Sequence, residues 1–445
     1  MDVAKLALKV PEVLLPGPGV DLHRWAVIAC DQYTSEPEYW DAVDRLVADR
    51  PSTLRLVFPE VYLEDAGGDA RIADINASMK QYLADGVLVS QGPGFVLVDR
   101  KTSHVPSRKG LIVALDLEAY DYRPGSKTLI RTTEGTIVDR LPPRIRVREN
   151  AAIELPHIMV LIDDPEQTVI EPLCQAELEK IYDFELMQGG GHLRGWRVAQ
   201  PELLEQVASA LGALAVKERF QKRYEVNDNE VMLYAMGDGN HSFATAKAIW
   251  EQLKSAASDP ADIMTHPARY ALVELVNLHD PGLEFEAIHR VVFDVSVDDL
   301  LARAEAYYQA VGTPCIVAEY PGLVAATAAV AAAGTAHAIA FVTAQGYAVL
   351  RIDQPSLTLE VATLQNFLDE YLKSRSKARI DYIHGDAAVT RLGSQQGNIG
   401  FYLPSISKHD LFRTIVRDGA LPRKTFSMGE ADEKRFYLEA RRITR

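Results

Sequence analysis

Residues 231–254 place a strand pattern, a glycine-rich turn and a helix pattern directly after one another. The apolar run 231–236 is rich in strand formers and ends at Met236, and an alanine-rich stretch with helical spacing starts near Ser242. The turn between them reads Gly237, Asp238, Gly239, Asn240, His241 and Ser242. The segment predicts a turn at the carboxyl end of a strand and the amino end of a helix, and it favours a fold in which strands and helices alternate.

This turn has the backbone geometry of an anion site. The first N–H groups of a helix lack partners within the helix and carry a partial positive charge. Gly237 and Gly239 allow a tight turn and a close approach of backbone to a ligand. With Asn240 and Ser242 they are the candidate phosphate-binding residues of the turn. We expect Gly239→Val to clash with the ligand and to weaken phosphate binding more than it lowers stability.

Two further side chains of the turn suit chemistry near neutral pH. Asp238 supplies a carboxylate and His241 an imidazole, and both groups can move protons. Asp238 is also the candidate metal ligand. The alternative is structural, because Asp, Asn and Ser are ordinary caps at strand-to-helix junctions. The turn carries neither the P-loop pattern nor the dinucleotide-binding glycine pattern, so its chemistry alone leaves a ligand site and a cap open.

The composition narrows the classes of function. A length of 445 residues allows two or three domains. The 47 basic and 62 acidic residues give a net charge of −15, which disfavours a nucleic-acid or membrane-surface partner. No segment resembles a signal peptide or a spanning helix, and the three cysteines are too far apart for a zinc pair or a disulfide framework. We expect a cytoplasmic protein.

Apolar patterns divide the chain into three expected segments. Residues 1–165 form an N-terminal α/β domain, residues 166–295 a helix-rich region around the strand–turn–helix core, and residues 296–445 a C-terminal α/β domain that packs on the core. Strands are expected at 25–30, 94–99, 110–116, 157–163 and 269–278, and helices at 38–49, 71–83, 167–182 and 201–224. Residues 323–344 predict an alanine-rich surface helix followed by a strand. The fold class is therefore α/β, of mixed α+β type.

Residues 128–150 form a local positive island in an acidic protein, with arginines at 131, 140, 144, 146 and 148. The planar guanidinium group suits phosphates and carboxylates bidentately. We favour a functional role for Arg131, Glu134 and Arg140, and we expect them to face the same cleft as the turn. For Arg148 we favour a solvated strand face, because Arg144, Arg146 and Arg148 alternate.

Three other segments carry candidate side chains. Residues 188–195 are glycine-rich and predict either a mobile lid, with His192 and Arg194 reaching a ligand, or a surface hairpin or linker. His289 and Arg290 precede an apolar run and can equally be a surface pair. Lys424 follows a turn in a basic loop near the C-terminus. No grouping of histidines indicates a transition-metal site.

Several of these segments, taken in order, resemble domain of unknown function 1015, a bacterial and archaeal family. The turn Gly237–His241 looks like the family's Asp-Gly-His-His-Arg turn, and Asp31 lies where the family has an Asp-containing turn. The other matching segments are 30–40, 131–140, 156–164, 277–283 with 289–290, and 421–426. The resemblance covers most of the chain.

The resemblance implies a ParB/sulfiredoxin-like core with elaborating helices and strands, in which the turn binds phosphate. Members of that superfamily bind or cleave nucleotides, and one branch phosphorylates free L-serine. This chain departs from the pattern at Ser242, where the turn usually carries arginine. Arg131, Arg140 or Lys424 could replace that charge if the fold brings them near.

The leading hypothesis is a cytoplasmic small-molecule kinase that transfers a phosphoryl group from ATP or ADP to a free amino acid, with L-serine the best single acceptor. Asp238 would hold Mg²⁺ or move a proton, and Glu134 or His241 would act as base. The substrate or lid candidates are Asp31, His192, Arg194, His289 and Arg290. A homodimer is left open. The alternative is a non-catalytic regulator that binds a nucleotide or phosphometabolite, and the net charge argues against a DNA-associated protein.

Overall fold

The strongest apolar runs of the sequence become the central strands of one mixed sheet. These strands are β4 (Phe95–Lys101), β5 (Arg108–Asp116), β8 (Met159–Ile162) and β12 (Tyr270–Asn277). The other members are β1 (Leu8–Lys9), β6 (Ile130–Arg131), β9 (Glu179–Glu185), β10 (His192–Val198) and β11 (Tyr234–Asp238). The order is β6-β11-β8-β12-β5-β4-β10-β9, and β1 pairs with β5. The computed structural model describes residues 3–63 and 65–445.

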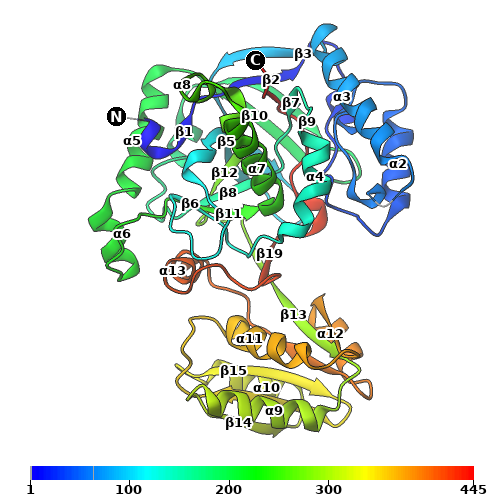
Figure 1. Ribbon diagram of the computed structural model, residues 1–445, viewed down its shortest axis with the longest axis vertical. Helices are drawn as coiled ribbons and strands as arrows, with labels where there is room; N and C mark the ends of the chain where they lie inside the picture. Colours follow the sequence, from blue (N-terminus) through cyan, green and yellow to red (C-terminus); the bar gives the residue numbers. More distant parts are fainter. Residues whose placement is uncertain (1–2, 64) are drawn as a thin grey trace. The chain divides into compact units, whose positions relative to one another are not determined.

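Alternate residues along these strands face two separate cores, as the pleat of a strand requires. On β4, Phe95 and Leu97 belong to one buried cluster, and Val96 and Val98 belong to the other. Helices α5 (Pro201–Leu214) and α7 (Asn240–Ala256) complete the first core, and both lie on the sheet in Figure 1. Helices α2 (Pro37–Val47) and α3 (Gly68–Ala84), with the chain around Phe436, complete the second. The sheet is therefore covered on both faces.

This sheet belongs to a discontinuous unit made of the chain up to Glu284 and the closing segment Met428–Arg445. The strand pair of β7 (Ile153–Glu154) and β20 (Arg441–Arg442) ties the closing segment into it. A second strand pair joins β2 (Glu12–Pro16) and β3 (Leu88–Pro93). The remaining α-helices are α1 (Leu22–Trp25), α4 (Leu141–Arg148), α6 (Lys217–Tyr224) and α8 (Pro260–Ile263). We call this part unit 1.

Unit 2 spans Phe285–Ser427 and has its own antiparallel sheet. Its strands are β13 (Phe285–Phe293), β14 (Cys315–Tyr320), β15 (His337–Thr343), β16 (Gly346–Ile352), β17 (Arg379–His384) and β18 (Ile399–Tyr402). Its helices are α9 (Val297–Ala310), α10 (Leu323–Ala331), α11 (Glu360–Lys373), α12 (Asp386–Gly393) and α13 (Lys408–Asp418). The strand order is β14-β16-β15-β18-β13-β17, and β19 (Phe426–Met428) pairs with β13. The expected alanine-rich helix and following strand are α10 and β15.

The mixed α/β class is confirmed, but the chain is divided differently from the three expected segments. The sheet of unit 1 contains strands from two of the expected segments, 1–165 and 166–295. The closing segment Met428–Arg445, which was expected to belong to the third, is part of unit 1. Long-range strand pairing decides this division, and no local pattern records it. None of the described helices is both long and apolar enough to cross a lipid bilayer.

Three expected elements differ in the structure. The single helix expected at 201–224 is two helices, α5 and α6, which are separated at residues 215–216. The strand expected at 25–30 is not formed. Trp25 ends α1, and the apolar residues 26–29 are buried against the closing segment, where the Ala29 N–H group donates to Arg435 O. Residues 167–182 do not form a helix; a short 3-10 helix, Glu171–Gln175, precedes β9. Strand β9 pairs with β10, and the ring of Tyr182 lies directly over Gly195, where a Cβ atom would be 2.0 Å from it. This non-local packing overrides the helical pattern.

Candidate functional site

The predicted strand, turn and helix are present at residues 234–256. Strand β11 extends to Asp238, Gly239 is the N-cap, and α7 begins at Asn240, two residues before the expected start. Gly239 has a φ of 79°, which favours glycine, and a Cβ atom there would lie 3.0 Å from Ile158 Cα. The fold itself therefore requires Gly239. This corrects our expectation for Gly239→Val, which strains the backbone before any ligand is considered.

Gly239 has no side chain, so the N-cap residue places no side-chain cap over the start of α7. The Gly239 N–H group donates to Asp238 Oδ1 at 2.8 Å, and Asp238 Oδ2 lies 3.4 Å from Lys434 Nζ. Burial raises the pKa of the Asp238 carboxyl, but the charge of Lys434 and the hydrogen bond from the Gly239 N–H group oppose the rise, and the pKa is lowered overall. The turn thus holds an ionised carboxylate beside an ammonium group, next to a helix end that can receive an anion.

The segment 131–140 runs beside this turn. Strand β6 is parallel to β11, Thr132 Oγ1 donates to Asn240 Oδ1 at 3.1 Å, and the Ile137 N–H group donates to His241 Nε2 at 3.3 Å. The next helix, α4, packs against α7 (Figure 1). Arg148 is the last residue of α4, which has prolines in its first turn, so the solvated strand face favoured for Arg148 is wrong.

The candidate side chains of this segment point in different directions. The buried guanidinium of Arg131 donates to the carbonyls of Thr128 and Glu230, which precede β6 and β11, so it points away from the turn at their other end. Arg140 is exposed and Glu134 is half-buried. The phosphate-binding role of Arg131 and Arg140 and the catalytic role of Glu134 stay predictions.

Of the two alternatives left open for residues 188–195, the structure has the hairpin and not the lid. His192 and Arg194 lie in β10, and only the short loop before His192 connects it to β9, which is the hairpin alternative. His192 contacts Asp183 and Glu185 at 2.6 and 2.8 Å, and Arg194 pairs with Asp99 at 2.6 Å. Five strand spacings separate β10 from β11, so at about 4.8 Å each these side chains lie roughly 24 Å along the sheet from the turn.

His289, Arg290 and Lys424 belong to unit 2. Arg290 is fully buried and donates to Gln365 Oε1 and to backbone carbonyls, Lys424 O at 2.8 Å among them. His289 is buried as well, and its Nδ1 accepts the Leu403 N–H group at 3.0 Å. The surface pair weighed for these two residues is therefore wrong. The Lys424 side chain is exposed.

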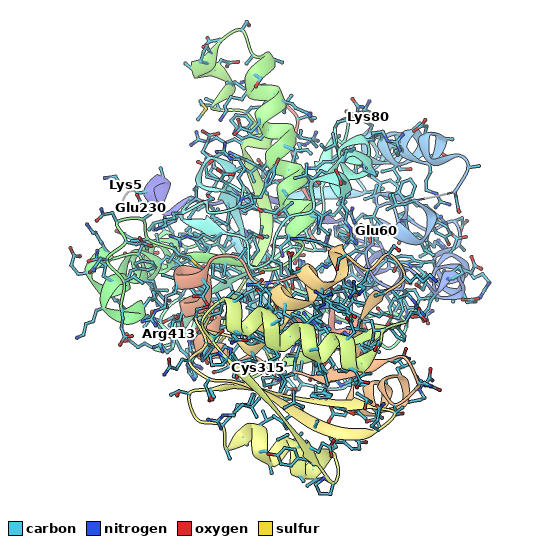
Figure 2. All side chains as sticks on the ribbon, turned by 60° about the horizontal axis from the view of Figure 1, so that its bottom comes forward. Lys5, Glu60, Lys80, Glu230, Cys315 and Arg413 are labelled. Atoms are coloured by element: carbon cyan, nitrogen blue, oxygen red, sulfur yellow. The ribbon has the colours of Figure 1, made fainter. Side chains whose placement is uncertain are left out.

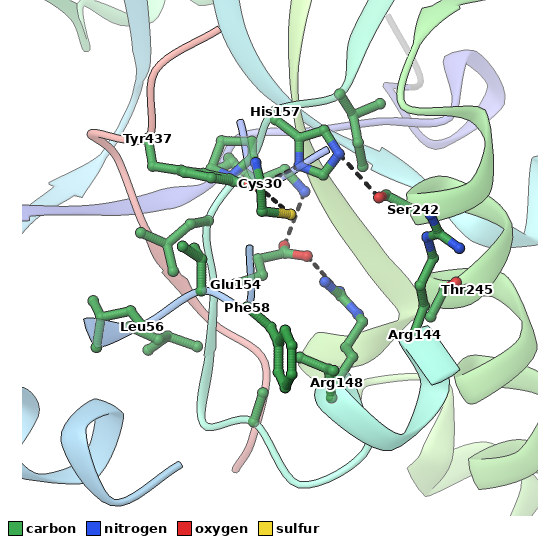
Figure 3. Close-up of a pocket in the computed structure, with 18 of the residues that line it drawn as sticks. Cys30, Leu56, Phe58, Arg144, Arg148, Glu154, His157, Ser242, Thr245 and Tyr437 are labelled. Carbon is green, nitrogen blue, oxygen red and sulfur yellow. Dashed lines mark hydrogen bonds and ion pairs between the residues drawn. The ribbon is translucent and has the colours of Figure 1, made fainter. Parts of the chain in front are cut away.

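A cavity of about 140 Å³ lies in unit 1 beside the start of α7 (Figure 3). Its wall is mainly apolar, with side chains from the loop after α2, from α3 and α4, and from the chain before β8. Its polar members are Cys30, Glu60, Arg144, Arg148, Glu154, His157, Ser242, Thr245 and Tyr437. Asp31, the candidate from the N-terminal motif, directly follows Cys30, and its Oδ1 atom accepts from Gln32 Nε2 at 3.0 Å.

Two ion pairs line this cavity. Arg144 Nη2 contacts Glu60 Oε1, and Arg148 Nη2 lies 2.5 Å from Glu154 Oε2. Burial raises the pKa of Glu60 even though Arg144 opposes the shift, and Asp31 adds to the rise. A buried carboxyl with a raised pKa is suited to accept or donate a proton nearer neutral pH. Glu60, labelled in Figure 2, was not predicted from the sequence.

A chain of hydrogen bonds crosses the same cavity (Figure 3). Ser242 Oγ lies 3.0 Å from His157 Nε2, and His157 Nδ1 lies 2.9 Å from the Tyr437 hydroxyl. That hydroxyl donates to Cys30 Sγ at 3.1 Å and accepts the Cys30 N–H group at 3.2 Å. Burial raises the pKa of the Cys30 thiol, so the sulfur is a neutral neighbour and not a thiolate. The four residues come from four separate segments.

The described residues contain no group of three His, Cys, Asp or Glu side chains that could hold a metal ion. Asp238 is a single carboxylate that already faces Lys434. A lone carboxylate beside an ammonium group does not fit a protein-built Mg²⁺ site, and the metal role of Asp238 stays a prediction.

Fold and site together define a mixed α/β protein with a small charged cavity beside a strand–turn–helix. The family model described as "Protein of unknown function (DUF1015)" matches residues 14–371, and the chain belongs to that family. No curated protein matches the sequence.

Several solved structures are similar in outline. A free serine kinase variant in complex with ADP is 12% identical, over 75% of this chain and 92% of that one, with a TM-score of 0.37. A conserved hypothetical protein from Pyrococcus furiosus is 13% identical, over 75% and 95%, with a TM-score of 0.34. SbnI from Staphylococcus aureus, truncated at its C-terminus, is 9% identical, over 72% and 82%, with a TM-score of 0.35. Similarity at this level carries no argument about function.

Proposed function

We propose that this protein is a small-molecule kinase that transfers a phosphoryl group from ATP or ADP to a free amino acid, with L-serine as the first acceptor to test. The observation that carries the proposal is the cavity beside the start of α7, with the Glu60–Arg144 ion pair in its wall. Phosphoryl transfer needs donors around the phosphates, a positioned acceptor and a base for its hydroxyl.

The size and charge of the cavity support an amino-acid acceptor. Its volume of about 140 Å³ is close to the roughly 150 Å³ cavity that holds benzene, a molecule of six heavy atoms. A free amino acid is of similar size and carries one charge of each sign. Arg144 offers a partner for its carboxylate and Glu60 one for its ammonium group. The nucleotide is too large for this space and would lie outside it.

The turn supports the phosphate side of the proposal. The N–H groups at the start of α7 would receive the transferred phosphate, as in the ParB/sulfiredoxin-like turn, and Thr132, Thr133 and Lys434 lie beside it. The exposed Arg140 remains a candidate for contacts with the distal phosphates, whereas the Arg131 guanidinium is bonded to the Thr128 and Glu230 carbonyls away from the turn.

Glu60 is our choice of base, ahead of Glu134 and His241. The acceptor oxygen would bond to the terminal phosphorus as the bond to the bridging oxygen breaks. Its proton would pass to Glu60, and the nucleotide would leave one phosphate shorter. His241 is a weaker choice because its Nε2 atom already accepts the Ile137 N–H group.

The test is a panel of free amino acids with ATP or ADP and Mg²⁺, followed by phosphorus NMR. We expect a phosphomonoester with serine. Glu60→Gln should keep nucleotide binding and lower turnover about 10²–10⁴-fold, and Glu38→Gln on the exposed side of α2 is the matched control. Tight nucleotide binding without turnover of any amino acid would overturn the kinase and favour the regulator.

A further inference from the structure

We propose that Ser242 is a nucleophile activated by His157, and that the cavity hydrolyses small, uncharged carboxylic esters through an acyl-serine intermediate. This activity is separate from phosphoryl transfer and uses other side chains of the same cavity. Ser242 Oγ and His157 Nε2 lie 3.0 Å apart, and both residues line the cavity. A serine and a histidine at hydrogen-bond distance, with the histidine held by a third group, form the usual arrangement for covalent catalysis.

The third group is the hydroxyl of Tyr437, and its hydrogen bonds accommodate the reactive tautomer of His157. A phenol has one proton and two acceptor positions. The Tyr437 proton goes to Cys30 Sγ and one acceptor position takes the Cys30 N–H group. With the Tyr437 proton placed on Cys30 Sγ, the contact with His157 Nδ1 at 2.9 Å takes the proton of the imidazole, which is the tautomer that the proposed reaction requires. With Nδ1 protonated, Nε2 carries the lone pair and accepts the hydroxyl proton of Ser242.

Packing holds this pair in place. Tyr437 is 2% exposed, and its ring meets the edge of the His157 ring at 86° with centroids 5.5 Å apart. Ser242 is the third residue of α7, so its backbone is fixed by the helix. Neither partner needs to move to form the reactive hydrogen bond. Such preorganisation distinguishes a catalytic pair from two side chains that meet by chance.

The surroundings favour an uncharged acyl group. Each of the two arginines in the wall forms an ion pair with a glutamate, so the cavity has no excess positive charge that would favour an anionic substrate. Leu56, Phe58, Ile153 and Leu272 give it apolar walls. The volume of about 140 Å³ limits the acyl group to a few carbons.

The reaction balances without a further reactant except water. Ser242 Oγ adds to the ester carbonyl carbon as its proton passes to His157 Nε2. The bond from that carbon to the alcohol oxygen then breaks, and the alcohol leaves with the proton from His157. Water, deprotonated by His157, attacks the acyl-serine, and the carboxylic acid and free Ser242 are released.

The test uses the full chain with p-nitrophenyl acetate, without nucleotide, and with a fluorophosphonate probe followed by peptide mass spectrometry. We expect a burst of p-nitrophenol and the probe on Ser242. Ser242→Ala should abolish both, His157→Gln should slow hydrolysis about 10²–10⁴-fold, and Ser255→Ala on the exposed side of the same helix should change neither.

Tyr437→Phe separates a positioning role from a structural one. It should lower kcat and leave KM nearly unchanged, because the phenol acts on the tautomer of His157 and not on the ester. Labelling of wild-type protein needs no variant, so the proposal remains testable if Ser242→Ala does not fold. A probe found on another residue, or hydrolysis that persists in a folded Ser242→Ala protein, would overturn the proposal.

Discussion

Arg435 is the side chain on which the stability of unit 1 should depend most steeply. Its guanidinium contacts Glu274 on β12 and Glu439 in the closing segment, and its Nε atom donates to Pro156 O at 2.8 Å. The three side chains are at most 3% exposed. Arg435→Met would keep most of the volume and remove the charge, leaving two buried carboxylates without their common partner.

The expected loss follows from these contacts. Breaking a buried ion pair by removing one partner costs about 3–5 kcal/mol, and the hydrogen bond to Pro156 adds about 1 kcal/mol. Arg100 and Arg108 still face Glu274, so the two carboxylates do not double the cost. We therefore expect a decrease of about 4–6 kcal/mol in the free energy of unfolding, a large part of the roughly 5–15 kcal/mol that a domain has.

Urea unfolding followed by tryptophan fluorescence measures this directly, because Trp25, Trp40, Trp196 and Trp250 are the four tryptophans of the chain and all lie in unit 1. Arg146→Met is the control, since the Arg146–Asp69 pair is exposed and such pairs contribute about 1 kcal/mol or less. A loss below about 1 kcal/mol for Arg435→Met would refute the reasoning.

The Arg435–Glu274 ion pair also predicts how the stability of unit 1 depends on pH, and which further substitutions restore the stability of Arg435→Met. Burial raises the pKa of Glu274, but Arg435, with Arg108 and Arg100, outweighs it and the folded-state pKa is lowered. The stabilisation by Glu274 is therefore present above its pKa in the unfolded chain and is lost as the pH falls through its pKa in the folded protein. The free energies of unfolding of wild type and Arg435→Met should therefore become similar at acid pH. Adding Glu274→Gln and Glu439→Gln to Arg435→Met should restore most of the stability at pH 7.

Three further outcomes are expected. Because burial raises the pKa of Glu60 above its usual 4.5, kinase turnover should rise with pH through an inflection above that value, and an inflection at or below it would exclude Glu60 as the base. Gly239→Val should lower the melting temperature through its φ of 79° and its contact with Ile158, whereas an unchanged value would show that the turn relaxes. Asp238→Asn should cost about 1.5–3 kcal/mol of stability, because the carboxylate contacts both Lys434 and the Gly239 N–H group, and it should also slow turnover; an early-melting variant with full activity per folded molecule would make Asp238 structural.

Local patterns predicted the elements whose neighbours in sequence decide their structure. The strand–turn–helix at 234–256, the strands β4, β5 and β12, and helix α5 all follow from apolar spacing and glycine placement. The helix expected at 167–182 was wrong; its last residues, 179–182, are held by pairing with β10, which local propensity cannot show.

The candidate site was predicted only where one segment carries it. Asp238, Gly239 and His241 adjoin in sequence, so their proximity was evident. His157 and Arg144 lie in segments that the sequence indicated as candidates, but their proximity to Glu60 and Tyr437 depends on the fold. Cys30 and Tyr437, for example, are 407 residues apart. The available sequence signals were His157 at the start of a buried-type strand and Glu60 after Pro59 and an apolar run. Neither signal indicates a cavity by itself.

The discontinuity of unit 1 sets an order on biosynthesis. The ribosome makes the sheet first, then the whole of unit 2, and Met428–Arg445 only afterwards. Until that segment arrives, the nascent sheet lacks Phe436 and Leu438 on one face, Glu274 has no Arg435, and His157 has no Tyr437. A chain that stops within unit 2 would carry an exposed apolar face, a target for chaperones and proteases. Ligand binding in the cavity would then report that synthesis has passed Tyr437.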